Sequence, residues 1–465
     1  MRAQTSILVV FAVGVLAQIT PADTSATASL ATQAKVELPV QKAAMGDYEV
    51  VENWPRPLPN NDLSHDGWTW GSGAGVWAES PDKVWVAQRG EIQLPPGSTP
   101  WICPCLLTPR RTNTGRRPYS GKDYPYEMRR HHLIFAVDRD GNTIKEWLQH
   151  DRFLAPPRGS GLGEVGRGPH KLLINPYDPQ KHIWIVDDDM HVINIFTNEG
   201  VLVKTMGERG VPGRGPNNFN RPTDIAWLPD GTFFVADGYA GTRVAKFDRN
   251  GKFIRDWGQP PVDPNKPGPY EFWSVHSIGI SRDRRVFVAD GYAGTRVAKF
   301  DRDGKFIRDW GRPPADPNKP GPYEFWSVHS IGISRDRRLF VADREHHRMQ
   351  VFDENGKFLE MWPTGHDSAV LAHIVTQDDY IWVADWTTDR LVKYDLNGRY
   401  ILDIGGHGPQ PGQFDGVHQI SVDQERNLYV TEVANDRSQK FRPKPNADPA
   451  KIVGPMVGGW PGSPK

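Results

Sequence analysis

The stretch FVADGYAGTRVAKFDRNGKFIRDWG, residues 234–258, decides the fold. It contains short apolar runs with alternating polar side chains, and Asn250-Gly251 is a dipeptide typical of a tight β-hairpin turn. The stretch belongs to a block that occurs twice, because residues 234–286 and 287–339 share 49 of 53 positions. Identity this high indicates either a recent duplication of one β-unit or an error in the assembly of the sequence.

A weaker copy of the same unit recurs on both sides of this block. Each copy has an apolar strand that ends in an acidic or polar residue, followed by a polar turn and a second strand. The last six of these end positions are 50, 53, 53, 42 and 47 residues apart, which is the size of a β-propeller blade. We therefore predict an all-β propeller with seven blade-like units, whose end positions are Gln88, Asp187, Asp237, Asp290, Asp343, Asp385 and Glu432.

The composition excludes several classes of protein. The 465 residues include 46 Gly, 41 Pro and 17 Trp but only two Cys, which does not suit a disulfide-stapled mini-protein, a coiled coil or a disordered chain. Lys and Arg number 56, as do Asp and Glu, so no extended basic field is available for nucleic acid or a membrane surface. We expect a partner that is recognised by a local site, and the sequence gives no oligomeric state.

The chain divides into four regions. Residues 1–22 are predicted to be a signal peptide, because Arg2 precedes an apolar run that is too short for a membrane span. An N-terminal extension (23–67), the propeller (68–442) and a C-terminal tail (443–465) follow, and an insertion at about 95–130 interrupts the first blade. We therefore expect an exported protein, either secreted or periplasmic.

Four histidines share one position in their blades. His276, His329 and His418 each stand fourteen residues before their end position, and His170 stands seventeen before Asp187. The innermost strand of each blade lines the channel of a propeller, so equivalent positions converge on its axis. Three neutral imidazoles around an open position are typical of a zinc site, whereas a lone histidine is more often structural. The sequence therefore predicts channel zinc.

Arginine and tyrosine side chains follow several of the same strand ends. Arg89 and Arg344 come directly after an end position, and Tyr239 and Tyr292 come two residues after one. An arginine there could bind a substrate carboxylate, and a tyrosine whose pKa is lowered by a nearby cation could act as a general base. It is an equally good interpretation that the arginines form salt bridges at the rim and that the tyrosines are packing aromatics. The remaining polar histidines, in Arg-rich stretches, are expected to be solvated, namely His131, His132, His346 and His347.

The motifs resemble a known family. The blades are similar to NHL repeats, and the order of motifs resembles the lyase domain of peptidylglycine amidating enzymes, peptidyl-α-hydroxyglycine α-amidating lyase. The resemblance covers roughly residues 75–442 and is most specific in NNFNRPTDIAWLPDGTFFVADGYAGTR (217–243) and SVHSIGISRDRRLFVADREHHRMQVF (327–352). It implies a propeller whose channel zinc is held by three histidines, with two arginines and a tyrosine around a substrate that has a free carboxylate.

The resemblance also assigns residues. By motif, the zinc ligands would be His170, His418 and either His329 or its copy His276. The remaining site residues would be Arg89, Arg344 and either Tyr239 or Tyr292. The family propeller has six blades, so the duplicated unit makes a seventh here. The resemblance also implies a structural calcium ion as a possible second cofactor. The family uses an acidic residue directly after the last histidine for this ion, whereas this chain has Gln419 there.

Three functions are compatible with these patterns. The resemblance implies a metal-dependent lyase that cleaves the C–N bond of a peptidyl- or acyl-α-hydroxyglycine, a carbinolamide, to an amide and glyoxylate. A non-catalytic exported NHL propeller would instead be a binding scaffold. A lactonase-like propeller hydrolase would need channel carboxylates, but the shared channel position holds histidine.

Overall fold

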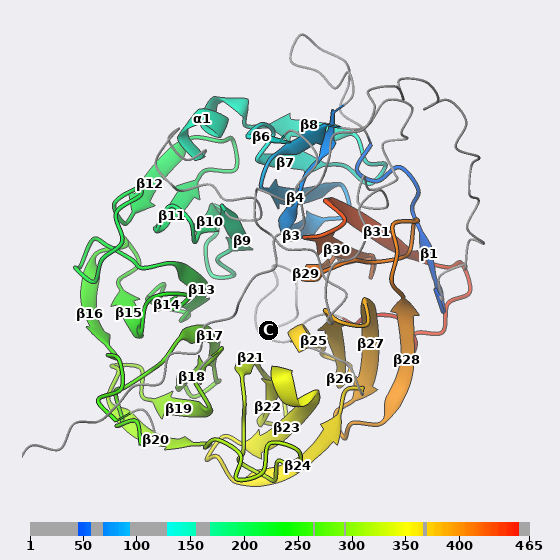
Figure 1. Ribbon diagram of the computed structural model, residues 1–465. Helices are drawn as coiled ribbons and strands as arrows, with labels where there is room; N and C mark the ends of the chain where they lie inside the picture. Colours follow the sequence, from blue (N-terminus) through cyan, green and yellow to red (C-terminus); the bar gives the residue numbers. More distant parts are fainter. Residues whose placement is uncertain are drawn as a thin grey trace, which may run out of the picture. The chain divides into compact units, whose positions relative to one another are not determined.

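The computed structural model describes residues 45–56, 68–93, 128–154, 168–263, 266–292, 294–365 and 370–454. Seven four-stranded antiparallel sheets lie around a common centre (Figure 1), which confirms the all-β propeller and its seven blades. The predicted signal peptide, most of the insertion and the end of the tail lie outside the described residues. In the part of the chain that is described, no helix has the length and apolar character needed to cross a membrane.

The blades are numbered in chain order and written from the innermost strand outward. Blade 1 has β3 (Gly73–Ser80), β4 (Lys83–Gln88), β7 (Ile134–Val137) and β8 (Thr143–Glu146), and blade 2 has β9 (Pro169–Ile174), β10 (Ile183–Asp187), β11 (Val192–Phe196) and β12 (Leu202–Met206). Blade 3 has β13 (Pro222–Trp227), β14 (Phe233–Asp237), β15 (Arg243–Phe247) and β16 (Phe253–Trp257), and blade 4 has β17 (Val275–Ile280), β18 (Val286–Asp290), β19 (Arg296–Phe300) and β20 (Phe306–Trp310). Blade 5 has β21 (Val328–Ile333), β22 (Arg338–Asp343), β23 (Arg348–Asp353) and β24 (Phe358–Pro363). Blade 6 has β25 (Val370–Val375), β26 (Tyr380–Asp385), β27 (Arg390–Asp395) and β28 (Tyr400–Gly405), and blade 7 has β29 (Val417–Val422), β30 (Leu428–Glu432), β31 (Arg437–Pro443) and β1 (Tyr48–Val50).

The ring closes through its two ends. Innermost strands contact each other from β3 through β9, β13, β17, β21, β25 and β29 and back to β3. The outermost strand of blade 7 comes from the other end of the chain, because β1 pairs with β31 in an antiparallel ladder. Tyr48–Val50 lies within the stretch that the sequence assigns to an extension before the propeller. Because the two ends of the chain pair within one blade, the ring is closed by backbone hydrogen bonds between strands.

A buried carboxylate ends the second strand of most blades, and it contacts two other segments of the same blade. In blade 3, Asp237 accepts a hydrogen bond from the backbone N–H of Asn220 (2.6 Å) and pairs with Arg243 (2.8 Å). Blade 5 repeats this with Asp343, which accepts from the N–H of Trp326 (3.0 Å) and pairs with Arg348 (2.9 Å). The carboxylate therefore holds the segment that enters the innermost strand against the start of the third strand.

Tryptophans at blade edges explain why the hairpin turns need glycine. Gly304 has φ +78°, and a Cβ there would lie 2.5 Å from the ring of Trp257 in the preceding blade. Gly356 has φ +74° and would meet Trp310 at the same distance. Glycine tolerates the left-handed backbone and leaves room for the ring, so the turns at Gly304 and Gly356 also pack one blade on the next.

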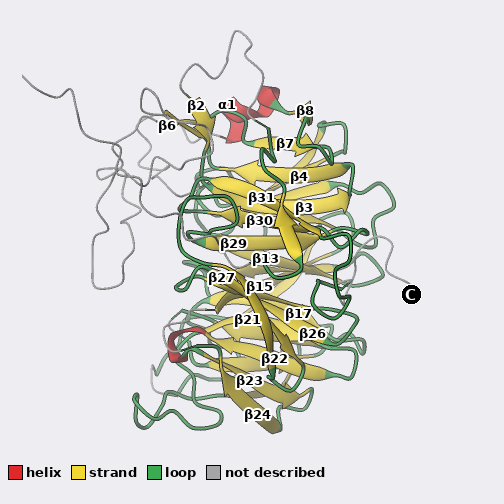
Figure 2. Ribbon diagram, turned by 90° about the vertical axis from the view of Figure 1, so that its right-hand side faces the viewer, coloured by secondary structure: helices red, strands yellow, loops and turns green. Residues whose placement is uncertain are grey.

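A small sheet stands beside the ring at blade 1. It consists of β2 (Trp68–Trp70), β5 (Glu91–Gln93) and β6 (Met128–Arg129), with β5 between the other two. Figure 2 shows the ring from its edge, with β2 and β6 at one of its faces. The described helices are short: 3-10 turns at Leu148–His150 and Arg344–His346, and α1 (Asp151–Leu154).

The closure of the ring predicts that Tyr48→Ala destabilises the whole propeller. Tyr48 is fully buried on β1, where its hydroxyl accepts from the N–H of Val453 (2.8 Å) and its ring packs edge-on to Trp382. Removing a buried aromatic side chain costs about 3–5 kcal/mol of unfolding free energy. Urea denaturation measures the change. Tyr400→Ala, on the outermost strand of blade 6 and 54% exposed, is the matched control and should stay within about 0.5 kcal/mol.

Candidate active site

The four channel histidines occupy the same structural position. His170, His276, His329 and His418 are each the second residue of an innermost strand. At each of them the ladder register shifts by one residue, so the histidine lies in a β-bulge. A bulge leaves a residue out of the ladder and redirects its side chain. The alternation of the strand alone does not give this orientation.

Hydrogen bonds between neighbouring blades orient two of these rings. Nδ1 of His418 lies 2.8 Å from the carbonyl oxygen of Ala74, the residue at the equivalent bulge of blade 1. Nδ1 of His276 lies 2.8 Å from the carbonyl oxygen of His329 in the next blade. A carbonyl only accepts, so Nδ1 carries the proton in both rings and Nε2 keeps a lone pair. These two rings therefore have the tautomer that a metal ligand needs.

One half of the site, which we call the Arg89 group, contains His170, His418, Tyr239 and Arg89. The His170 and His418 rings lie 5.0 Å apart between centroids, and His170 Nε2 shares a hydrogen bond with the Tyr239 hydroxyl at 3.0 Å. Arg89 is buried, and its guanidinium donates to the carbonyl oxygen of Pro169 (3.3 Å) and to the hydroxyl of Ser72 (3.4 Å). Two imidazoles, a phenol and a guanidinium thus meet at one side of the channel.

The other half, which we call the Arg344 group, contains His276, His329, Tyr292 and Arg344. The His276 and His329 rings are 3.9 Å apart between centroids, and His329 Nε2 lies 3.3 Å from the Tyr292 hydroxyl. The guanidinium of Arg344 lies 5.4 Å from the centre of the Tyr292 ring. Tyr239 joins the two groups, because its ring is 5.5 Å from His276 and 5.6 Å from Tyr292. Each group therefore contains two histidines, a tyrosine and an arginine, and the duplicated units supply both tyrosines and the His276 and His329 pair.

Burial controls the charges in this site. It lowers the pKa of His418 to about 3 and that of His276 to about 4, and it puts the pKa of His170 well below its ordinary value. Burial also raises the pKa of Tyr239 well above its ordinary value, with Tyr292 adding to the rise, although Arg89 lowers it. By themselves, these residues hold neutral imidazoles and a neutral phenol.

The donor chemistry of the channel histidines fits zinc. Nδ1 of His170 and Nε2 of His276 are buried and have no hydrogen-bond partner among the described residues. Neutral imidazole nitrogens of this kind are common zinc ligands. Among the described residues, two groups have three ligand atoms within 4.8 Å of one another, and neither group contains a channel histidine. The channel histidines thus form two pairs rather than one compact set.

The residues next to His418 do not fit calcium. The amide nitrogen of Gln419 donates to the carbonyl oxygens of Val76 and Leu172, each at 3.1 Å. Because both carbonyls only accept hydrogen bonds, the nitrogen and not the oxygen of the amide faces them. Calcium needs six to eight oxygen ligands, usually with carboxylates among them. The neutral N–H donor of Gln419 offers no ligand to such an ion.

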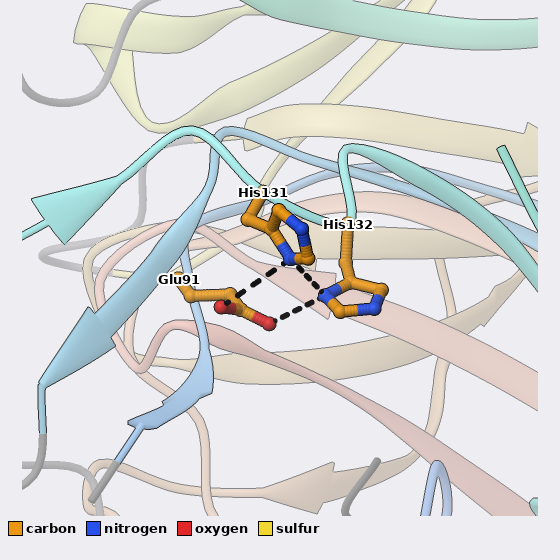
Figure 3. Close-up of side chains that lie close together, drawn as sticks. All are labelled: Glu91, His131 and His132. Atoms are coloured by element: carbon orange, nitrogen blue, oxygen red, sulfur yellow. Dashed lines mark hydrogen bonds and ion pairs between the residues drawn. The ribbon is translucent and has the colours of Figure 1, made fainter. Parts of the chain in front are cut away.

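A second cluster lies outside the channel histidines, and the sequence did not point to it. Glu91, His131 and His132 offer ligand atoms that all lie within 4.8 Å of one another (Figure 3). His132 is 1% exposed, and the side chain of His346 is 3% exposed and contacts Asp343, so the prediction that these two are solvated is wrong. An Arg-rich stretch carries no local signal of burial, and Glu91 is forty residues from His131.

Three comparisons with known proteins bear on this chain. The NHL repeat family matches residues 325–352. Peptidyl-alpha-hydroxyglycine alpha-amidating lyase 1 of Drosophila melanogaster is 39% identical over 304 residues, which is 61% of this chain and 46% of that protein. A probable peptidyl-alpha-hydroxyglycine alpha-amidating lyase of Caenorhabditis elegans is 29% identical over 195 residues, which is 41% of this chain and 51% of that protein. The chain therefore spans about half of the length of these two relatives.

A solved structure supports the fold alone. The streptogramin B lyase structure aligns with a TM-score of 0.51 and 12% identity, and the alignment covers 80% of this chain and 94% of that one. At this identity the likeness concerns the propeller and not the chemistry.

The lowered histidine pKa values predict a loss of stability in acid. A folded-state pKa below the unfolded value of about 6.5 means that the stabilisation is present above that pH and is lost as the pH falls towards 4. With metal removed by a chelator, the free energy of unfolding should fall between pH 7.5 and pH 5 in both proteins. The fall should be about 2 kcal/mol smaller in His276→Asn than in the wild type. Thr223→Ala, at the equivalent bulge of blade 3, is the non-titrating control. An unchanged pH difference in His276→Asn would contradict the burial of a neutral ring.

Proposed function

The chain is an NHL-repeat β-propeller that resembles peptidyl-α-hydroxyglycine α-amidating lyases, and from this premise we propose that it is a carbon–nitrogen lyase. Its proposed substrate is a peptidyl- or acyl-α-hydroxyglycine, which is cleaved to an amide and glyoxylate. The observation that carries the proposal is the Arg89 group, where the Tyr239 hydroxyl lies 3.0 Å from His170 Nε2 beside buried Arg89.

The reaction transfers one proton from oxygen to nitrogen, forms a C=O bond and breaks the C–N bond. The substrate hydroxyl loses its proton to a base, and its oxygen forms the carbonyl of glyoxylate. The C–N bond breaks with its electron pair on nitrogen, and the nitrogen takes a proton to become the amide. The protein must therefore supply a proton acceptor near the hydroxyl and a positive charge near the carboxylate.

Tyr239 is the proposed proton acceptor. Its hydroxyl lies 3.0 Å from His170 Nε2, and this contact holds the phenol beside the histidines of the Arg89 group. Arg89 opposes the rise in the pKa of Tyr239 that burial causes. Tyr292 is the matched duplicate, but it is 39% exposed and lies with the Arg344 group. We assign the base to Tyr239, the less exposed copy.

Arg89 is the proposed carboxylate-binding residue. Its contacts to Pro169 and Ser72 use Nε and Nη1, which fixes the guanidinium and leaves Nη2 for a ligand. A buried guanidinium binds a carboxylate more strongly than an exposed one and orients it in a plane. Arg344 has the equivalent place in the other group, so it is the second candidate for this contact.

Zinc is the proposed cofactor, held by His170 and His418 with either His276 or His329 as the third ligand. A bound divalent cation would supply positive charge that lowers the pKa of the substrate hydroxyl and of the neighbouring phenol. The hydrogen bond of His418 to Ala74 keeps its Nε2 directed away from the strand. An exported location, secreted or periplasmic, and a small-molecule or peptide substrate complete the proposal.

Glyoxylate release from an N-acyl-α-hydroxyglycine tests the activity. We expect release by the purified protein that stops on chelation and returns with zinc. Tyr239→Phe should lower kcat by about 10²–10⁴-fold, because a positioned base contributes that much. Tyr292→Phe, the same change in the duplicated copy, should lower it less than tenfold. Equal effects of the two variants would contradict the choice of Tyr239, and zinc-bound protein that releases no glyoxylate would favour a binding scaffold.

A substrate without the carboxylate tests Arg89. The wild type should prefer the free acid to its carboxamide analogue in kcat/KM. Arg89→Gln should lose at least tenfold of that preference, because the amide side chain keeps hydrogen bonding but removes the charge. The measurement is the kcat/KM ratio of the two substrates in each protein. An unchanged ratio in Arg89→Gln, with Arg344→Gln abolishing it, would move the carboxylate contact to the other group.

A further inference from the structure

Glu91, His131 and His132 are arranged as metal ligands at the base of the insertion. His132 Nδ1 lies 2.7 Å from Glu91 Oε1 and 2.7 Å from His131 Nδ1, and His131 Nδ1 lies 3.9 Å from Glu91 Oε2. Figure 3 shows both rings turned towards the Glu91 carboxylate. We propose that these three side chains bind a second zinc ion, separate from the channel site.

The outward nitrogens of both rings face carboxylates. His132 Nε2 lies 2.9 Å from Glu146 Oε2, and His131 Nε2 lies 3.9 Å from Asp151 Oδ2. A histidine that ligates zinc usually donates its other N–H to a carboxylate, which fixes the ring and raises its basicity. The His132 ring is therefore held with Nδ1 as its ligand atom, and His131 Nδ1 lies 2.7 Å from that atom.

The backbone of the histidine pair is also held in place. The Asp151 carboxylate accepts hydrogen bonds from the N–H groups of His132 (2.9 Å) and Leu133 (3.0 Å). His132 has φ +51°, a left-handed conformation that a non-glycine residue adopts at a cost. This conformation of His132, held by Asp151, lets the Nδ1 atoms of the two consecutive histidines lie close together.

The charges at the cluster suit a divalent cation. Three carboxylates, those of Glu91, Glu146 and Asp151, contact the histidine pair, and Arg129 contributes one positive charge through its 2.5 Å contact with Glu91. Two imidazoles and one carboxylate are a common set of three protein ligands for zinc, with an open fourth position. His131 is the partly exposed member, with 19% of its side chain accessible, so an ion has a way in.

A metal here would fasten the small sheet to blade 1 near Arg89. Glu91 begins β5, two residues after Arg89, and His131 follows Arg130, whose guanidinium donates to the carbonyl oxygen of Arg89. The His pair leads into β7 of blade 1. The proposed ion therefore joins the two chain segments that lead out of and back into the first blade.

Zinc content after equilibrium dialysis, measured by mass spectrometry, tests this site. His131→Ala and Glu91→Gln should each lower the zinc content by one equivalent, whereas the double variant His170→Ala/His418→Ala should retain that equivalent. His182→Ala is the matched control, because His182 also pairs with a carboxylate, that of Asp178, but lies outside the cluster. An unchanged zinc content in both His131→Ala and Glu91→Gln would overturn the proposal.

A spectroscopic measurement covers the case in which a ligand variant fails to fold. X-ray absorption of zinc in the folded His170→Ala/His418→Ala protein should show two imidazoles and oxygen ligands. Absence of bound zinc from that protein, or a spectrum without imidazole scattering, would also overturn the proposal. Because the double variant removes two proposed channel ligands, failure of the lyase activity and failure of this second site give different results.

Discussion

The buried carboxylate at the end of the second strand is the interaction on which each blade's geometry depends. In blades 3, 4, 5 and 7, this carboxylate accepts a hydrogen bond from a backbone N–H three residues before the bulge and lies beside the arginine that starts the third strand. That arginine also donates to carbonyls of the loop before the blade, as Arg243 does to Gly215 and Arg348 to Gly321. Such a pair is costly to bury unless its remaining groups are satisfied, and in blades 3 and 5 these loop carbonyls accept hydrogen bonds from the remaining N–H groups of the arginine. The bulge residue, the strand end and the residues after it are thereby fixed together.

This geometry explains how the ring accepts a duplicated blade without losing its channel residues. Blades 4 and 5 each bring a histidine at the bulge, and blades 3 and 4 each bring a tyrosine two residues after the carboxylate. The result is a site in two groups, with Tyr239 between them. In the Arg89 group the two histidines come from blades 2 and 7, which flank blade 1, and the small Ala74 occupies the bulge between them.

Desolvation outweighs the local charges in deciding what the site can do. Arg89 lowers the pKa values of His170, His418 and Tyr239, but burial is the larger cause for each. The histidines are therefore neutral, and the phenol would need additional positive charge to act as a base. One residue away from His418, Gln419 satisfies two carbonyls with an uncharged amide. A neutral imidazole and a hydrogen-bonded neutral amide are therefore adjacent in this strand.

The sequence by itself determined the repeated elements of this protein. The 53-residue period, the Asn-Gly and Asp-Gly turns and the apolar strands predicted an all-β propeller of seven blades, because these patterns are local and periodic. Registering the strand ends also placed His170, His276, His329 and His418 at one position. Only the tertiary structure decided their division into two groups, since this depends on which blades become neighbours in the ring. It also decided that Tyr48 completes the last blade and that Glu91 meets His131 and His132, because contacts between distant segments leave no spacing in the sequence.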